Sequence, residues 1–121
     1  MDKIKRGDIL WIDLGQNPKT HLQSGCRPCI VVSSNKANQS SKTFNVIPGT
    51  TKKKKDNFPV HLKIFPKDID GFLGKTTTFL IESICTIDEK QILYKAGHIK
   101  ENSSIIPTIN NMLIRQLGLE L

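Results

Sequence analysis

The 121 residues of this chain suffice for one modest hydrophobic core, so residues 1–121 are expected to form a single domain. No apolar run approaches the roughly 20 residues that cross a bilayer, and the opening MDKIKRGD does not resemble a secretory signal, so we expect a cytoplasmic protein without a membrane partner. Eighteen lysines and arginines against 11 carboxylates give a formal charge of +7, which favours a nucleic acid or an acidic protein as partner.

In chain order, the sequence predicts short strands separated by glycine, proline and polar turns. From their β-branched and aromatic content, strands are expected at residues 9–14, 28–33, 43–47, 58–64, 76–84 and 95–99. Pro48 cannot donate to a sheet ladder, so the pairing of the third strand is expected to end or bulge there. The fourth strand alternates apolar and polar residues, which predicts that His61 lies on its exposed face.

Fewer segments have helical signals. A short helix is expected to begin at Thr86 or Asp88, residues 66–74 are expected to be loop with a helical turn, and 35–41 to be a polar turn. After Pro107, apolar residues at helical spacing predict a terminal amphipathic helix that stops at Gly118. The predicted class is therefore mainly β with appended α, a small and strongly bent barrel.

A polar loop at 15–25 is too long for a tight hairpin, and it carries His21 and Gln23. It leads to Arg27 at the mouth of the buried second strand. An arginine fixed by the strand beneath it suits a binding or catalytic role, although a surface ion pair is the commoner use of such a residue.

Three cysteines are an odd number for a disulfide framework. Cys26 and Cys29 form a C-x-x-C, but zinc would need two further ligands and thioredoxin-like chemistry would need a helix here, whereas Pro28 and the run after it predict a strand. We expect Cys29 to face the core and Cys26 the loop, both as free thiols. A metal or redox role is the less favoured alternative.

Four consecutive lysines, 52–55, follow Thr50 and Thr51 after the third strand. Such blocks are ordinarily just solvated, but this one concentrates positive charge at the end of a strand. It adds weakly to the preference for an anionic partner.

Several segments, in the same order along nearly the whole chain, carry a family resemblance. They are RGDILWIDL at 6–14, QSGCRP at 23–28 with IVV after it, PGTT at 48–51, PVHL at 59–62, ESICTID at 82–88 and LIRQLGL at 113–119. Together they resemble the MazF/PemK/Kid family of toxin ribonucleases from bacterial toxin–antitoxin pairs. The resemblance implies an SH3-like barrel of about five to seven strongly bent antiparallel strands with a short helix and a C-terminal helix.

The resemblance also implies a homodimer that cleaves single-stranded RNA, usually messenger RNA, without a metal or other cofactor, and that a cognate acidic antitoxin inhibits. By position, Arg27 corresponds to the family's catalytic arginine and Thr50 to its catalytic threonine, with Thr51 as the alternative. His21 matches a loop histidine that some members use at the RNA, and Glu82 matches the acidic residue of a Glu-Gln-Ile-Arg-Thr-type motif. The implied RNA-binding set is Gln23, Thr51, Lys52, Lys53, Lys54, Ser83 and Thr86.

RNA can be cut without a metal because its own 2′-hydroxyl is the nucleophile, which leaves a 2′,3′-cyclic phosphate and a 5′-hydroxyl. The planar fork of Arg27 can bond two phosphate oxygens, and Thr50 can donate to the same phosphate. His21 and Glu82 are candidates for general base or general acid. The plainer alternatives are that His21 is a mobile surface residue and that Glu82 pairs with a lysine.

The chain departs from the family pattern at a few positions. Ser83 stands where many members have glutamine, Cys85 where most have arginine, and Leu22 where some have an acidic residue. These changes bear on base preference and on phosphate contacts. Relatives of the same fold poison DNA gyrase by binding it, so a non-catalytic toxin or nucleic-acid-binding module is the alternative function. Arg27 and Thr50 favour the enzyme.

Overall fold

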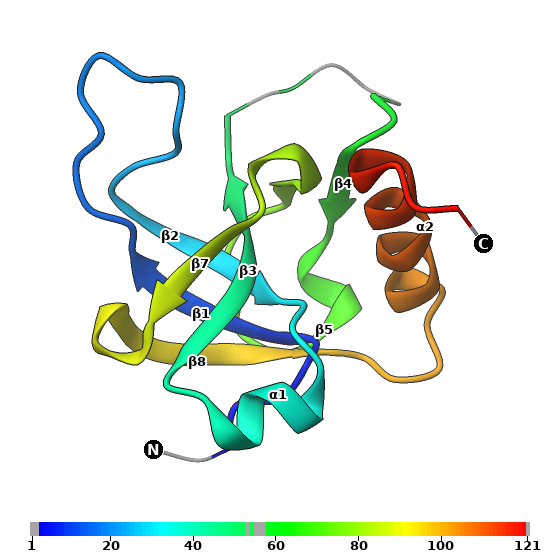
Figure 1. Cartoon of the computed structure of the whole chain (residues 1–121). Coiled ribbons are helices and arrows are strands. Elements are labelled where there is room, and N and C mark those ends of the chain that lie inside the picture. The colour runs from blue at the N-terminus through cyan, green and yellow to red at the C-terminus, as the bar shows by residue number, and fades with distance from the viewer. Residues whose placement is uncertain (1–2, 53, 55–57, 121) are drawn as a thin grey trace.

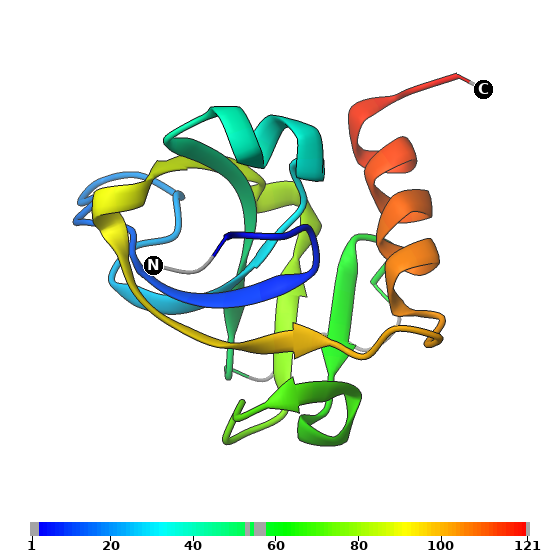
Figure 2. The same ribbon diagram turned by 90° about the horizontal axis from the view of Figure 1, so that it is seen from below.

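Eight short strands form one curled antiparallel sheet, a half-barrel (Figures 1 and 2). The computed structural model describes residues 3–52, 54 and 58–120. The strands are β1 (Asp8–Asp13), β2 (Cys26–Val31), β3 (Thr43–Thr50), β4 (His61–Ile64), β5 (Ile69–Gly71), β6 (Thr77–Leu80), β7 (Cys85–Asp88) and β8 (Ile92–Ile99). Their order is β4-β6-β3-β2-β1-β8-β5, and β7 also pairs with β3. The mainly β class is confirmed.

The helical elements are α1 (Asn35–Ser40), α2 (Ile105–Leu117) and the 3-10 turns η1 (Pro66–Asp68), η2 (Ile81–Ser83) and η3 (Glu89–Gln91). The terminal helix is confirmed: Pro107 lies in its first turn, where a missing N–H is harmless, and Gly118 ends it with φ of 66°. No helix in the described part of the chain is both long and apolar enough to cross a membrane.

The strand expected over 76–84 ends at Leu80, where the turn η2 that carries Glu82 begins. Two further local predictions were wrong. The segment expected to begin a helix near Thr86 is strand β7, which pairs with β3, and Asp88 caps only the single turn η3. The segment expected to be a polar turn is helix α1, capped by Ser34, whose side chain accepts a hydrogen bond from the N–H of Ala37. With β7 and the three-residue β5, the strand count exceeds the expected range.

Strand β3 continues past Pro48, but its pairing with β2 ends there and its pairing with β6 begins. Up to Pro48 it pairs with β2, with Pro48 opposite Cys29. Beyond it, Gly49 and Thr50 pair with Phe79 and Thr78 of β6. The residue that cannot donate therefore lies at the change of partner, and Thr50 is held inside the sheet.

Apolar side chains alternate between two cores, one on each face of the sheet. In β1, Ile9 belongs to the core that is covered by Ile109 of α2. Leu10 and Ile12 belong to the second core, which Cys85 and Leu14 border. Leu14, Cys85 and Ile87 of the second core also line the groove described in the next subsection.

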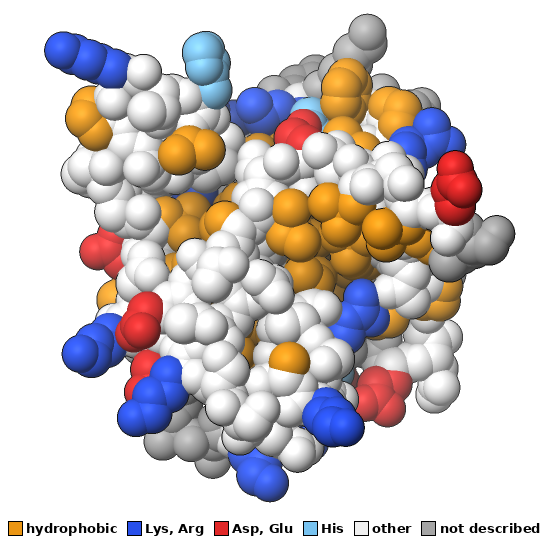
Figure 3. Space-filling view, viewed as in Figure 1, with side chains coloured by type: hydrophobic (Ala, Val, Ile, Leu, Met, Phe, Trp, Pro, Cys, Tyr) orange, Lys and Arg blue, Asp and Glu red, His pale blue; other side chains and the backbone are white. Residues whose placement is uncertain are grey.

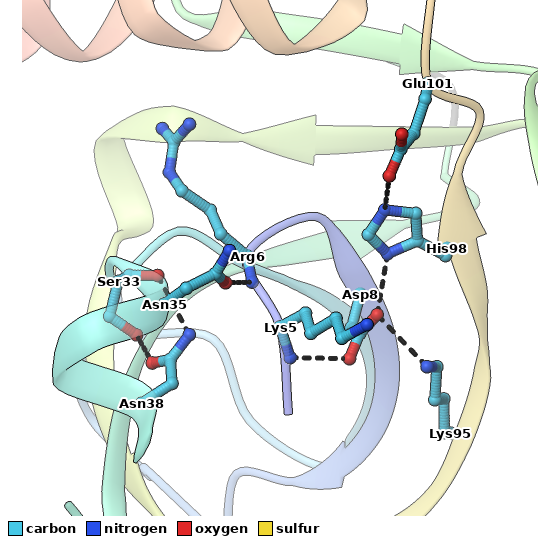
Figure 4. Close-up of polar contacts among 9 residues, drawn as sticks. All are labelled: Lys5, Arg6, Asp8, Ser33, Asn35, Asn38, Lys95, His98 and Glu101. Carbon is cyan, nitrogen blue, oxygen red and sulfur yellow. Dashed lines mark hydrogen bonds and ion pairs between the residues drawn. The ribbon is translucent and has the colours of Figure 1, made fainter. Parts of the chain in front are cut away.

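A buried carboxylate fixes the start of β1 (Figure 4). Asp8 is fully buried, and its side chain accepts hydrogen bonds from the backbone N–H of Lys5 at 2.8 Å and from Nδ1 of His98 at 2.7 Å. Nζ of Lys95 lies 3.2 Å away. A buried charge needs such partners, so these contacts tie β1 to β8.

Candidate active site

Arg27 is fixed between the long loop and the end of β3. Its Nε donates to the carbonyl of Ser24 at 2.8 Å, and its Nη1 donates to the carbonyl of Gly49 at 3.4 Å. The side chain is part-buried in β2, opposite Ile12 of β1. Two backbone carbonyls thus orient the guanidinium, and no other described residue takes its remaining N–H groups, which a ligand can bond.

Thr50 lies next to the hydrogen bond between Arg27 and Gly49, because the Gly49 carbonyl belongs to the peptide bond that joins Gly49 to Thr50. The β2–β3 pairing ends with Cys29 opposite Pro48, so Arg27 and Thr50 each lie two residues beyond the last pair, at the same end of the two strands. Thr50 is buried, at 5% exposure, and its Oγ1 accepts a hydrogen bond from the N–H of Lys52 at 3.2 Å. The structure therefore brings Arg27 and Thr50 together.

A groove of about 420 Å³ opens beside this pair. Of the candidate site residues, it is lined by His21, Gln23, Glu82, Ser83 and Thr86. Its other lining residues are Leu14, Asn17, Leu22, Pro48, Ile84, Cys85, Ile87 and Gln91. One wall is the projecting 14–25 loop and the other is η2 with β7 (Figures 1 and 3). Arg27 and Thr50 do not line the groove themselves. Pro48, which does, is two residues from Thr50, and Gln23, which does, precedes Ser24, whose carbonyl Arg27 bonds.

The 14–25 loop has hydrogen bonds of its own. At its base, the N–H of Leu14 donates to the carbonyl of Gly25 and the N–H of Gly25 donates to that of Gly15. Across its middle, Nδ2 of Asn17 donates to the carbonyl of Gln23 at 2.7 Å. The loop therefore presents His21 as an exposed side chain on a braced wall of the groove.

Among the described residues, the partner that the structure gives Glu82 is a histidine. Its Oε2 lies 2.6 Å from Nε2 of His61. The prediction that His61 is exposed was wrong, since only 14% of its side chain is accessible, because η2 and Phe58 cover that face of β4. Alternation within one strand could not reveal this contact, and the only signal for His61 was its place in the PVHL segment.

The lysine block leaves β3 at the end that carries Thr50. Lys52 is exposed and Lys54 is half-buried, whereas Lys53 lies outside the described residues. Thr51 is exposed. On the groove wall, Oγ1 of Thr86 accepts a hydrogen bond from Nδ2 of Asn45 at 3.0 Å.

All three cysteines are free, as predicted. Cys26 is exposed, Cys29 is buried and Cys85 is of intermediate exposure at the groove. Burial raises the pKa of the Cys29 thiol and, to a smaller extent, that of Cys85. These thiols are therefore protonated at neutral pH.

Solved structures of toxins share this fold. MazF (Form-I) from Deinococcus radiodurans matches with a TM-score of 0.77 at 17% identity, over 98% of this chain and 100% of that one. An endoribonuclease in complex with its cognate antitoxin from mycobacterial species matches with a TM-score of 0.74 at 22% identity, over 100% and 99%. The fold is thus that of MazF-type toxins.

The sequence gives the family. A family model described as PemK-like, MazF-like toxin of type II toxin–antitoxin system matches residues 5–116. Endoribonuclease MazF of Staphylococcus epidermidis is 31% identical over 116 residues, which cover 96% of this chain and 92% of that protein. The chain belongs to the PemK-like, MazF-like toxins of type II toxin–antitoxin systems.

Proposed function

We propose that this chain, an endoribonuclease of the MazF type, cleaves single-stranded messenger RNA at short sequences without a metal ion. The observation that carries the proposal is the guanidinium of Arg27 bonded to the Gly49 carbonyl, one peptide from Thr50, beside a groove lined by His21 and Glu82. Cutting messenger RNA in the cytoplasm stops translation and growth, which is what a toxin must do.

Arg27 and Thr50 stabilise the phosphate as it becomes pentavalent. The free N–H groups of Arg27 and the hydroxyl of Thr50 donate to its non-bridging oxygens, and preorganised donors of this kind contribute about 2.7–4 kcal/mol each to transition-state stabilisation. Thr50 suits this role better than Thr51, because it follows directly on the Gly49 carbonyl that Arg27 bonds and its hydroxyl is oriented by the N–H of Lys52.

Two groups on opposite walls of the groove move the protons. In an in-line displacement, the attacking and leaving oxygens lie on opposite sides of phosphorus, so the base and the acid must approach from opposite sides. Glu82 on η2 takes the proton of the 2′-hydroxyl as the bond from O2′ to phosphorus forms. His21 on the 14–25 loop donates a proton to O5′ as its bond to phosphorus breaks. The products are a 2′,3′-cyclic phosphate and a 5′-hydroxyl.

Other residues bind the strand without taking part in the chemistry. Gln23, Ser83 and Thr86 offer polar groups to base edges in the groove, and reading unpaired bases needs such contacts. Lys52 and Lys54 attract the phosphate backbone without reading sequence, and we assign exposed Thr51 to the same surface.

We further propose an acidic antitoxin that occupies the same groove and a homodimeric toxin. The charge of +7 favours an acidic inhibitor segment. The dimer is supported by apolar side chains that gather between β3 and α2 on the face shown in Figure 3. Met112 and Leu113 of α2 are only partly buried. Light scattering on the free toxin measures its oligomeric state.

The ribonuclease proposal is tested with a fluorescent single-stranded RNA in EDTA. We expect cleavage that leaves 2′,3′-cyclic phosphate ends, and Arg27→Ala is expected to lower kcat by about 10²–10³-fold. Lys36→Ala, on α1 at the opposite end of the molecule, is the control that keeps full activity. RNA that is bound but left intact by the unmodified protein would instead indicate a non-catalytic binding module, and no binding would point to a toxin with a protein target.

A further inference from the structure

The pair formed by His61 and Glu82 joins two segments that are distant in sequence. His61 begins β4, which pairs with β6 so that His61 lies opposite Leu80. Strand β6 runs directly into η2, which carries Glu82. The N–H of Ile81 donates to the carbonyl of Val60 at 2.9 Å, and this backbone bond fixes the two segments beside each other.

The imidazole of His61 is largely buried, and its Nε2 atom is the one that makes a hydrogen bond to a described residue. The ring of Phe58 lies 4.5 Å from it, between centroids, and its Nδ1 is buried without a hydrogen-bond partner among the described residues. Its Nε2 is 2.6 Å from Oε2 of Glu82. Among the described residues, the carboxylate of Glu82 is therefore the one hydrogen-bond partner of this ring.

Glu82, by contrast, faces the groove. Its side chain is 35% exposed and lines the groove with His21. His61 holds one of its oxygens, and among the described residues no hydrogen bond reaches the other. A carboxylate that is tethered through one oxygen has the second available for a ligand in a fixed direction.

We propose that His61 is a positioning residue of the cleavage site, which holds Glu82 through Nε2–H so that Oε1 meets the 2′-hydroxyl of the RNA. This inference rests on the proposed ribonuclease function. Without the tether, Glu82 rotates into solvent, and the proton of the 2′-hydroxyl is no longer met by a base at the start of the reaction. The effect falls on kcat, because RNA binding depends mainly on other groups.

Two substitutions of His61 separate this role from simple packing. In His61→Gln the amide nitrogen occupies the place of Nε2 and can still donate to Glu82. In His61→Asn it occupies the place of the buried Nδ1 and cannot reach the carboxylate. Both remove the imidazole, and both are neutral amides, so the two variants differ mainly in where the donor lies.

The measurement is kcat and KM for each variant on the RNA substrate in EDTA, with the melting temperature recorded alongside. We expect His61→Asn to lose about 10²-fold in kcat, similar to Glu82→Gln, with KM nearly unchanged, because proton transfer by a positioned group contributes about 10²–10⁴-fold. His61→Gln should recover most of that loss. The double variant His61→Asn/Glu82→Gln should be no slower than either single one.

Equal losses in His61→Gln and His61→Asn that follow their melting temperatures would overturn the inference and make His61 a packing residue. Normal kcat in His61→Asn would overturn it as well. In both cases the unmodified protein still cleaves and Arg27→Ala remains about 10²–10³-fold slower, so the ribonuclease proposal stands. Failure of the unmodified protein to cleave any single-stranded RNA would instead remove the proposed function itself.

Discussion

Two adjacent threonines at the end of β3 differ in their surroundings, and this difference predicts which one is active. Thr50 is buried and lies beside the Arg27 contact, whereas Thr51 is exposed. Valine removes the hydroxyl at nearly constant volume. We expect Thr50→Val to lower kcat by about 10²–10³-fold, as loss of a transition-state donor does, and Thr51→Val to change it little. Initial rates on one RNA substrate decide this, and the reverse order would reassign the hydroxyl to Thr51.

Cysteine reactivity should follow burial. Because burial raises the pKa values of Cys29 and Cys85, their thiolate fractions are low at neutral pH and increase only at higher pH. Iodoacetamide is expected to label exposed Cys26 first, Cys85 slowly but faster as the pH rises, and Cys29 only after unfolding. Peptide mass spectrometry measures the order, with Cys26→Ser as the control that loses the fast adduct. Rapid labelling of Cys29 in the folded protein would contradict it.

Among the elements, long β-branched runs identified most of the strands, and the two local errors have a common physical origin. α1 has no apolar periodicity, and its ends depend on contacts such as the Ser34 cap and the bond from Nδ2 of Asn38 to the Ser33 carbonyl. β7 is a strand because of four paired positions with β3, about forty residues earlier in the chain. Neither contact is visible in a local pattern.

Some contacts of the candidate site could likewise be predicted from local sequence patterns, and others could not. The nearness of Arg27 and Thr50 could be anticipated, because both lie at the ends of strong consecutive strands that pair. The contact between His61 and Glu82 could not, since it needs β4 to pair with β6 and then η2 to fold back over β4. A one-strand argument assigns His61 to solvent, and only the tertiary arrangement covers it.

Gly49, where β3 changes partner, has no room for a side chain. A Cβ there would lie 2.6 Å from Cγ2 of Thr77 and 2.8 Å from Cε1 of Phe79. Gly49→Ala is expected to destabilise the fold by about 1–3 kcal/mol through overpacking, and to lower kcat because the Gly49 carbonyl orients Arg27. Guanidinium unfolding and RNA cleavage rates measure the two effects.

Thr77→Ser supplies the matched control for Gly49. It removes the nearest methyl group, and its hydroxyl can still donate to the carbonyl of Lys75. Gly49→Ala combined with Thr77→Ser should therefore recover part of both losses. If the double variant is as impaired as the sum of the single ones, the clash with Thr77 is not the cause.

At the scale of the whole molecule, one end of the half-barrel gathers the parts of the site. The 14–25 loop, the end of β3, η2 and the start of β4 meet there, whereas α1 lies at the opposite end (Figure 1). Lysines are present at both ends: Lys52 and Lys54 follow β3, whereas Lys36 lies in α1 and Lys42 follows it. Variants that remove the same number of lysines from either end can therefore separate the effect of where the charge lies from the effect of the net charge.

If local charge binds the RNA, removing lysines at the site must change the salt dependence more than removing distant ones. Each phosphate contact to a single strand contributes about 0.7 to the slope of log K against log salt, so Lys52→Ala/Lys54→Ala should reduce the slope by about 1.4. Lys36→Ala/Lys42→Ala removes the same charge and should leave the slope nearly unchanged. Fluorescence anisotropy in an Arg27→Ala background, where the RNA stays intact, measures both. Equal reductions by the two pairs would mean that overall charge, and not the lysines beside the groove, attracts the strand.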